Sequence, residues 1–143
     1  MPSILEKFPD AHLQIIGEGE DFPVLEDIIK EKKLDSRIEL VGKIDQNELR
    51  FYYSSCDLYI SASTFEVCPV PTLEAMSCGK PLVLSDIEPH KEMINISNAG
   101  KIFSKSKPEE ISMAVSDVFH DKNNLGTLGR KFTELHDWSV ISK

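Results

Sequence analysis

The chain alternates short apolar runs with stretches in which apolar residues recur at helical spacing. The first apolar run covers residues 12–16 and is followed by Gly17 and Gly19, after which helical spacing continues to Lys33. A second apolar run covers residues 37–41 and is closed by Gly42. This order predicts a strand, a helix and a second strand parallel to the first.

The same alternation continues along the chain. Asp45 and Glu48 have the spacing of a capping box, which predicts a helix from Asp45 to about Ser55. Apolar runs then predict strands over residues 58–60 and 82–84. A short helix is expected over residues 90–94, and a short edge strand over residues 100–103.

Two further helices are expected to close the chain. Pro108 suits the first position of the earlier helix, and acidic residues at 109 and 110 favour its first turn. The inward faces are predicted to carry Ile111, Val115 and Val118, and then Leu125, Leu128, Phe132 and Leu135, leading towards Trp138. Because strands and helices alternate, we predict one α/β domain, a Rossmann-like, doubly wound and mostly parallel sheet of about five strands with flanking helices.

Composition narrows the function classes. The 143 residues suit a single domain, and 24 acidic against 16 basic residues give a formal charge of -8. This charge disfavours nucleic acid and anionic membranes as partners, so a bound phosphate must be held locally. Three cysteines without a CxxC pair, no signal peptide and no apolar run long enough to span a bilayer predict a cytoplasmic protein.

Metal and thiol chemistry are not expected. His12, His90, His120 and His136 lack metal-ligand spacing, and we expect them at the surface or in loops. Cys68 has no histidine or acid in a motif relation to it, so a small buried thiol is the simplest interpretation. With neither a DxD element nor a P-loop in the sequence, no metal and no cofactor are predicted.

The segment from Ser63 to Pro81 carries the candidate chemistry. It is predicted to join two parallel strands, with Glu66 on a loop and Glu74 near a helix start, at the sheet edge where such folds bind ligands. Pro71 favours a helix start, and first-turn amides at Thr72 and beyond have no partner within a helix. These amides and the Thr72 hydroxyl are therefore predicted to bind a diphosphate.

The two glutamates suit hydroxyl-rich ligands. Glu74, about one turn into the helix, is placed to accept hydrogen bonds from vicinal hydroxyls such as those of ribose, and Glu66 to do the same for a sugar. The alternative is that both are solvated surface glutamates, which is the commonest environment for this residue type. Spacing alone leaves the two interpretations open.

The string Ser63-x-x-Glu66-x7-Glu74-Ala75-Met76-x-x-Gly79-x-Pro81 resembles the donor-site signature of the group 1, or family 4, retaining glycosyltransferases with the GT-B fold. The resemblance continues in order on both sides of this string. Its other landmarks are residues 15–19, 38–42, 53–58, 85–92 and 98–100.

This resemblance implies that residues 1–143 form the C-terminal, nucleotide-sugar-binding half of a two-domain transferase. Glu66 would then be the catalytic candidate, facing the donor sugar and diphosphate, and Glu74 would hold the ribose. The further donor-binding positions implied are Ser63, Val70, Pro71 and Thr72, with Gly17, Gly19, Val41, Gly42 and Lys43 flanking the nucleoside.

The chain departs from the family pattern at Cys68-Pro69, where Phe-Gly is usual, and Pro69 has no amide proton for a phosphate. In the resembled family the donor half begins with another strand and a loop carrying an Arg and a Lys, and it ends in a further helix. We therefore expect a domain truncated at its first strand and last helix, with little turnover by this polypeptide alone.

Three functions remain as hypotheses. The first is a glycosyltransferase that moves a sugar from a UDP-, GDP- or ADP-sugar to a glycan or lipid acceptor with retention, together with an acceptor-binding domain or chain. The second is a non-catalytic module, from a shortened or split gene, that binds a nucleotide-sugar or a partner. The third, another α/β nucleotide binder such as a sugar-nucleotide epimerase, does not account for the Glu66-x7-Glu74 string.

Overall fold

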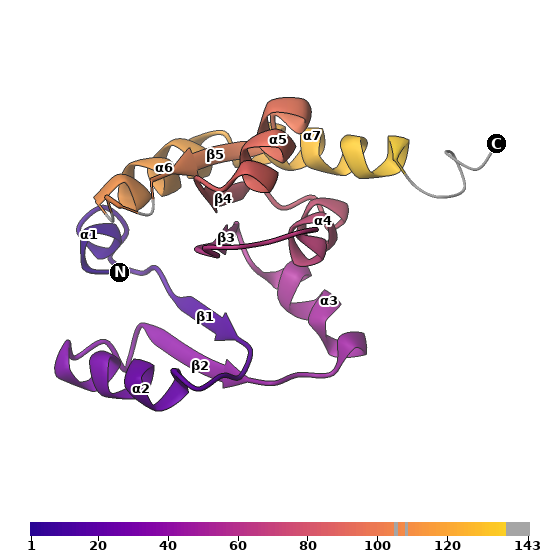
Figure 1. Cartoon of the computed structure of the whole chain (residues 1–143). Coiled ribbons are helices and arrows are strands. Elements are labelled where there is room, and N and C mark those ends of the chain that lie inside the picture. Colours follow the sequence, from indigo (N-terminus) through magenta and orange to yellow (C-terminus); the bar gives the residue numbers. More distant parts are fainter. Residues whose placement is uncertain (105, 108, 137–143) are drawn as a thin grey trace. The chain divides into compact units, whose positions relative to one another are not determined.

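The computed structural model describes residues 1–104, 106–107 and 109–136. Within these residues the chain forms seven helices and five strands, in the order α1, β1, α2, β2, α3, β3, α4, β4, α5, β5, α6, α7. It divides into two compact units, residues 1–49 and residues 50–143 (Figure 1). The expected roles of Pro108 and Trp138 lie outside the described residues.

The first unit contains α1 (Pro2–Leu5), β1 (Leu13–Ile16), α2 (Phe22–Glu31) and β2 (Ile38–Gly42). β1 and β2 are parallel neighbours (Figure 1), with Leu13 opposite Ile38. The register shifts after Ile15, so that Ile16 lies opposite Gly42. The predicted strand, helix, strand order is thus confirmed, although α2 ends two residues before Lys33.

The second unit contains β3 (Tyr59–Ser61), α4 (Val70–Ser77), β4 (Leu82–Ser85), α5 (Glu88–Ser97), β5 (Gly100–Phe103), α6 (Glu109–His120) and α7 (Lys122–Leu135). α3 (Gln46–Ser55) begins in the first unit and ends in the second. The sheet has the order β3-β4-β5, with both pairs parallel and β5 at an edge as predicted (Figure 1). The α/β class with five parallel strands is confirmed, and the strands form one sheet of two and one of three.

The core of the second unit is centred on β4. Leu82, Val83 and Leu84 are fully buried, because α4 and α6 contact this strand and β3 and β5 flank it. A continuous apolar run is typical of a parallel strand covered on both faces. Each such side chain contributes about 1.5–3 kcal/mol on burial, so β4 is the principal stabilising strand of this unit.

α7 packs closely against α4 and the turn that follows it. A Cβ atom added to Gly126 would lie 2.1 Å from the carbonyl oxygen of Gly79, so α7 approaches that turn backbone to backbone. Gly129, one turn later, is buried against Ala99 and Met76. The two glycines therefore permit the contact between α7 and the end of α4.

The inward faces of the closing helices agree only in part with the sequence prediction. Val115, Val118 and Leu125 are buried, whereas Leu135 keeps 58% of its surface exposed. Leu135 lies nearly two turns beyond Gly129, the last buried residue of α7 among those described, and therefore extends past the packed interface. In the described part of the chain, we find no helix with the length and hydropathy that a membrane span requires.

Candidate functional site

The loop between β3 and α4 holds Glu66 by a hydrogen bond from its own residues. The hydroxyl of Ser63 donates to Oε1 of Glu66 at 2.8 Å, and the Ser63 amide donates to the hydroxyl of Ser61 at 3.4 Å. Glu66 is half-buried, while its neighbours Phe65 and Val67 are exposed. Ser63 and Glu66, both predicted site residues, therefore lie in direct contact.

Glu74 lies in α4 and is held from α3. Its Oε2 accepts a 3.0 Å hydrogen bond from the hydroxyl of Tyr53, which is buried. Burial, together with the neighbouring Glu74 carboxylate, raises the pKa of Tyr53 well above its ordinary value of 10.0. The phenol therefore remains a hydrogen-bond donor, and a carboxylate can accept several such bonds at once.

The beginning of α4 corrects one prediction. The Thr72 amide donates to the Pro69 carbonyl at 3.0 Å, and the Leu73 and Val70 amides donate to the Pro69 and Cys68 carbonyls. Thr72 is only 1% exposed, and its side chain is hydrogen-bonded to Tyr59. The tight turn at residues 68–70 therefore already uses the amides of Val70, Thr72 and Leu73, contrary to the expectation that first-turn amides have no partner.

Val70 and Pro71 occupy the first two positions of α4 and are exposed, as a ligand-facing position requires. Pro71 has no amide proton, so neither residue offers an unused backbone donor. They therefore contribute surface to the site rather than hydrogen bonds.

Two other predictions were wrong. His90, expected at the surface, is fully buried on α5, where its ring faces Ser85 at the end of β4. Cys68, expected to be buried, is exposed, because it lies on the loop between β3 and α4 beside the exposed Val67. The described residues hold no cluster of three or more His, Cys, Asp or Glu side chains able to bind a metal ion.

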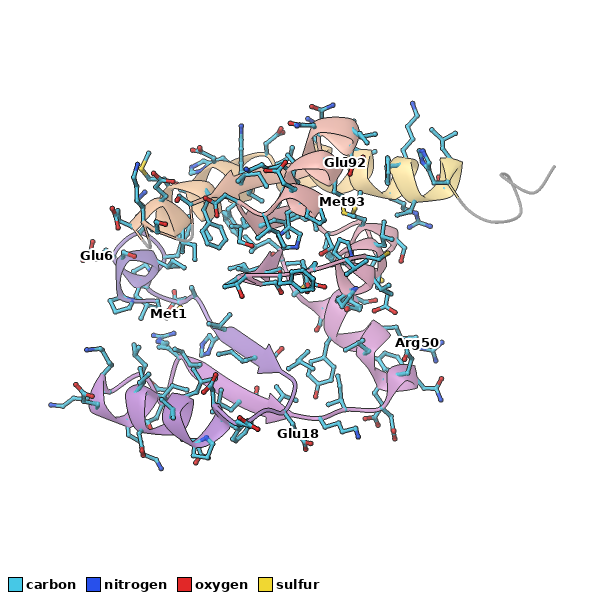
Figure 2. All side chains as sticks on the ribbon, viewed as in Figure 1. Met1, Glu6, Glu18, Arg50, Glu92 and Met93 are labelled. Atoms are coloured by element: carbon cyan, nitrogen blue, oxygen red, sulfur yellow. The ribbon has the colours of Figure 1, made fainter. Side chains whose placement is uncertain are left out.

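The predicted nucleoside-flanking residues belong to the first unit, at the carboxyl ends of β1 and β2. The Gly17 amide donates to the Gly42 carbonyl at 2.9 Å, and both glycines have positive φ angles, 133° and 75°. Val41 is half-buried beside them, whereas Gly19 and Lys43 are exposed. Glu18, labelled in Figure 2, marks the loop that contains Gly17 and Gly19.

An open groove of about 840 Å³ lies along α7 and contains none of the predicted site residues. Its Lys122 pairs with Asp57 at 2.6 Å, and its Arg130 pairs with Glu134 at 3.0 Å. The groove lies before β3 and β4, at the amino ends of the strands, whereas open α/β sheets bind ligands at the carboxyl ends. We therefore do not assign it as the ligand site.

Sequence reasoning did not predict three contacts around the candidate residues, those of Tyr53 with Glu74, Ser85 with Ser63, and His90 with Ser85. Tyr53 precedes Glu74 by 21 residues, and no local pattern predicts that the two side chains meet. The sequence did hold one indication of their importance. The landmark segments 53–58 and 85–92, which resemble the family pattern, contain Tyr53, Ser85 and His90.

Comparison with known proteins gives a consistent family. The family model described as "Glycosyl transferases group 1" matches residues 1–133. The alpha-monoglucosyldiacylglycerol synthase of Acholeplasma laidlawii is 27% identical over 125 residues, covering 87% of this chain and 31% of the relative. The chain therefore spans about a third of the length of this curated relative.

Two solved structures share the fold. Sucrose-phosphate synthase from Thermosynechococcus elongatus superposes with a TM-score of 0.84 at 22% identity, covering 98% of this chain and 38% of that one. The pneumococcal O-GlcNAc transferase in complex with UDP and GlcNAc superposes with a TM-score of 0.81 at 19% identity, covering 92% and 27%. At these identities the likeness establishes the fold alone.

Proposed function

This chain belongs to the group 1 glycosyl transferases, and we propose that it supplies the donor-binding half of an enzyme that transfers a sugar from a nucleotide-sugar with retention. The observation that carries the proposal is the state of Glu66 and Glu74. Both are half-buried, and each accepts a hydrogen bond from a protein hydroxyl, that of Ser63 or Tyr53. Solvated surface glutamates have no such fixed orientation, so this observation favours the functional interpretation.

In this proposal Glu74 binds the ribose and Glu66 faces the donor sugar and diphosphate, where it acts as the catalytic carboxylate. Oriented carboxylates discriminate well between a ligand that offers hydroxyl donors and one that does not. Ser63, Val70 and Pro71 line the sugar side, while Gly17, Gly19, Val41, Gly42 and Lys43 flank the nucleoside. We propose a site without a metal ion or other cofactor, because the sequence contains neither a DxD element nor a P-loop.

UDP is our first choice of nucleotide, since the pneumococcal transferase of the same fold was solved with UDP. GDP and ADP are the alternatives. The name of the Acholeplasma relative makes a lipid the first acceptor to test, with a glycan as the alternative. An acceptor-binding domain or chain would complete the enzyme, and three free cysteines favour the cytoplasm as its location.

One observation favours the second candidate, a non-catalytic module that binds a nucleotide-sugar or a partner. The amide and hydroxyl of Thr72 are used internally, and Pro69 and Pro71 have no amide protons. The start of α4 thus offers few donors to a diphosphate. A chain that binds neither nucleotide nor sugar conjugate would fit this candidate.

Calorimetric titration tests the proposal, using UDP, GDP, ADP and one sugar conjugate of each. We expect saturable binding of one nucleotide, and Glu74→Ala should weaken it about 10- to 100-fold, the cost of losing hydrogen bonds to a charged group. The matched control is Glu6→Ala, because Glu6 is exposed after α1 (Figure 2). Binding that persists unchanged in Glu74→Ala would contradict the ribose assignment.

A further inference from the structure

His90 is a buried histidine with an incomplete set of hydrogen bonds. Its exposed fraction is 0%, and Nε2 is buried without a hydrogen-bond partner in the described structure. Buried polar atoms nearly always have a hydrogen-bond partner. Because Nε2 has none, the hydrogen bonds at Nδ1 must hold this side chain in place.

The hydrogen bonds at Nδ1 have a defined direction. Nδ1 lies 3.2 Å from the Ser85 carbonyl oxygen and 3.1 Å from the Ser85 hydroxyl oxygen. A carbonyl can only accept, so Nδ1 carries the proton. The Ser85 hydroxyl donates to the Ser63 carbonyl at 2.5 Å, which leaves its lone pairs to receive the Nδ1 proton.

The same chain of bonds reaches Glu66. Ser63 accepts from Ser85 through its carbonyl and donates to Glu66 Oε1 at 2.8 Å through its hydroxyl. A contact that fixes the backbone of Ser63 therefore also restricts the position of the Glu66 carboxylate. Ser85 and His90 are fully buried, so water does not compete for the inner bonds.

Apolar packing holds little of the loop before its last residue, the buried Pro69. Phe65 is 79% exposed and Val67 is 83% exposed, so neither side chain anchors the segment on either side of Glu66. On the β3 side of Glu66, the hydrogen bond from Ser85 to Ser63 connects the loop to the buried core.

We propose that His90 is a positioning residue for Glu66. Through Ser85 and Ser63 it forms a relay of hydrogen bonds that holds the Glu66 carboxylate towards the donor sugar. This role rests on the proposed function of Glu66. Burial lowers the pKa of His90, against smaller opposing effects of the Ser85 hydrogen bond and the Glu66 charge, so the ring stays neutral and the bond directions persist at neutral pH.

Two matched pairs of variants test the relay in the full chain. His90→Leu removes the donor at Nδ1 while keeping a similar volume, whereas His90→Asn retains an amide donor near that position. Ser85→Ala removes the middle hydroxyl. Ser112→Ala is its control, because Ser112 is also buried and donates to the Glu109 carbonyl, within α6.

The first measurement needs no ligand. Backbone order parameters from ¹⁵N relaxation at Ser63 and Glu66 should fall from about 0.85 to below about 0.6 in His90→Leu and Ser85→Ala. They should stay near the wild-type values in His90→Asn and Ser112→Ala. Unchanged order parameters in His90→Leu and Ser85→Ala, with the rest of the spectrum native, would overturn the relay.

The second measurement compares the affinity for UDP with that for UDP-glucose. A loss of general structure weakens both ligands equally, whereas loss of positioning at Glu66 should weaken the sugar conjugate about tenfold more than UDP, the value of one misplaced hydrogen bond to a carboxylate. Equal weakening would overturn the donor-sugar role. A wild-type chain that binds neither ligand overturns the proposed function and the donor role together, while the order parameters still decide whether His90 holds the loop.

Discussion

The hydroxyl of Tyr53 on α3 donates a 3.0 Å hydrogen bond to the carboxylate of Glu74 on α4. The ring of Tyr53 is buried and meets the ring of Tyr59 edge to face, with 6.0 Å between centroids, which limits its movement. The position of Glu74 is therefore determined by two helices and not by α4 alone.

Tyr53→Phe should leave the fold intact while releasing the Glu74 carboxylate. Because Glu74 is half-buried, we expect the free energy of unfolding to fall by about 1 kcal/mol, below the range of about 1.5–3 kcal/mol for hydrogen bonds to charged groups. Nucleotide affinity should weaken severalfold in calorimetry. Tyr52→Phe is the control, and a Tyr53→Phe chain with wild-type affinity would restrict Tyr53 to a packing role.

His90 should make the second unit sensitive to acid. Burial lowers its pKa from the ordinary value of 6.5, so the unfolded chain takes up a proton at a higher pH than the folded chain does. The stability that this contributes is present above pH 6.5 and is lost as the pH falls below it, at a slope of up to about 1.4 kcal/mol per pH unit.

Urea unfolding of the wild type and of His90→Asn between pH 7.5 and about pH 5 checks this dependence. The difference between the two free energies of unfolding should shrink as the pH falls, because only the wild type has this group to protonate. A difference that is constant with pH would contradict the assignment of a neutral, buried ring.

Gly126→Ala should destabilise the chain in spite of the higher helix propensity of alanine. The added Cβ would meet the Gly79 carbonyl oxygen at 2.1 Å, a backbone atom that cannot rotate away. We expect a loss of about 2 kcal/mol or more in the free energy of unfolding, typical of overpacking. At Gly19 a Cβ would meet nothing within 4 Å, so Gly19→Ala should change stability by less than about 1 kcal/mol.

Cys68 should be the first cysteine to react with a thiol reagent. It is exposed, whereas Cys56 is partly buried and burial raises the pKa of the Cys56 thiol, which lowers its thiolate fraction. Mass spectrometry after brief labelling of the native chain should therefore find the label at Cys68, and Cys68→Ser should abolish the fast phase. If the loop that carries Glu66 contacts the donor, bound UDP-glucose should slow the labelling of Cys68 on the same loop. Equal labelling rates with and without saturating UDP-glucose would count against a contact between this loop and the donor.

The order of helices and strands could be predicted because each element has its own pattern of apolar residues within a short segment of the sequence. The run at residues 82–84 is apolar throughout, and the chain buries all of it. Burial of isolated polar residues could not be predicted in this way. His90 lies in a helix of mixed composition, and only the packing of that helix against β5 and α7 turns its ring inward, where it meets Ser85.

The site was predictable where it depended on local sequence and not where it depended on distant contacts. The proximity of Ser63 to Glu66 follows from three residues of spacing, whereas the Tyr53–Glu74 and Ser85–Ser63 bonds join segments more than twenty residues apart. The expectation of unpartnered amides at the start of α4 was wrong for another reason. Free amides at a helix start are the general rule, but the turn at Pro69 supplies carbonyls that use them here.

The close approach between α7 and the turn after α4 has an evolutionary consequence. Substitutions at the exposed positions of α7 should have little effect, whereas a side chain of any size at Gly126 would push the helix off the Gly79 backbone. In homologous chains that keep this contact, we expect glycine at this position to be invariant, and its replacement to occur only together with a rebuilt turn. If position 126 and the turn at residue 79 change together among homologues, their sequences alone would identify the lineages in which α7 packs differently.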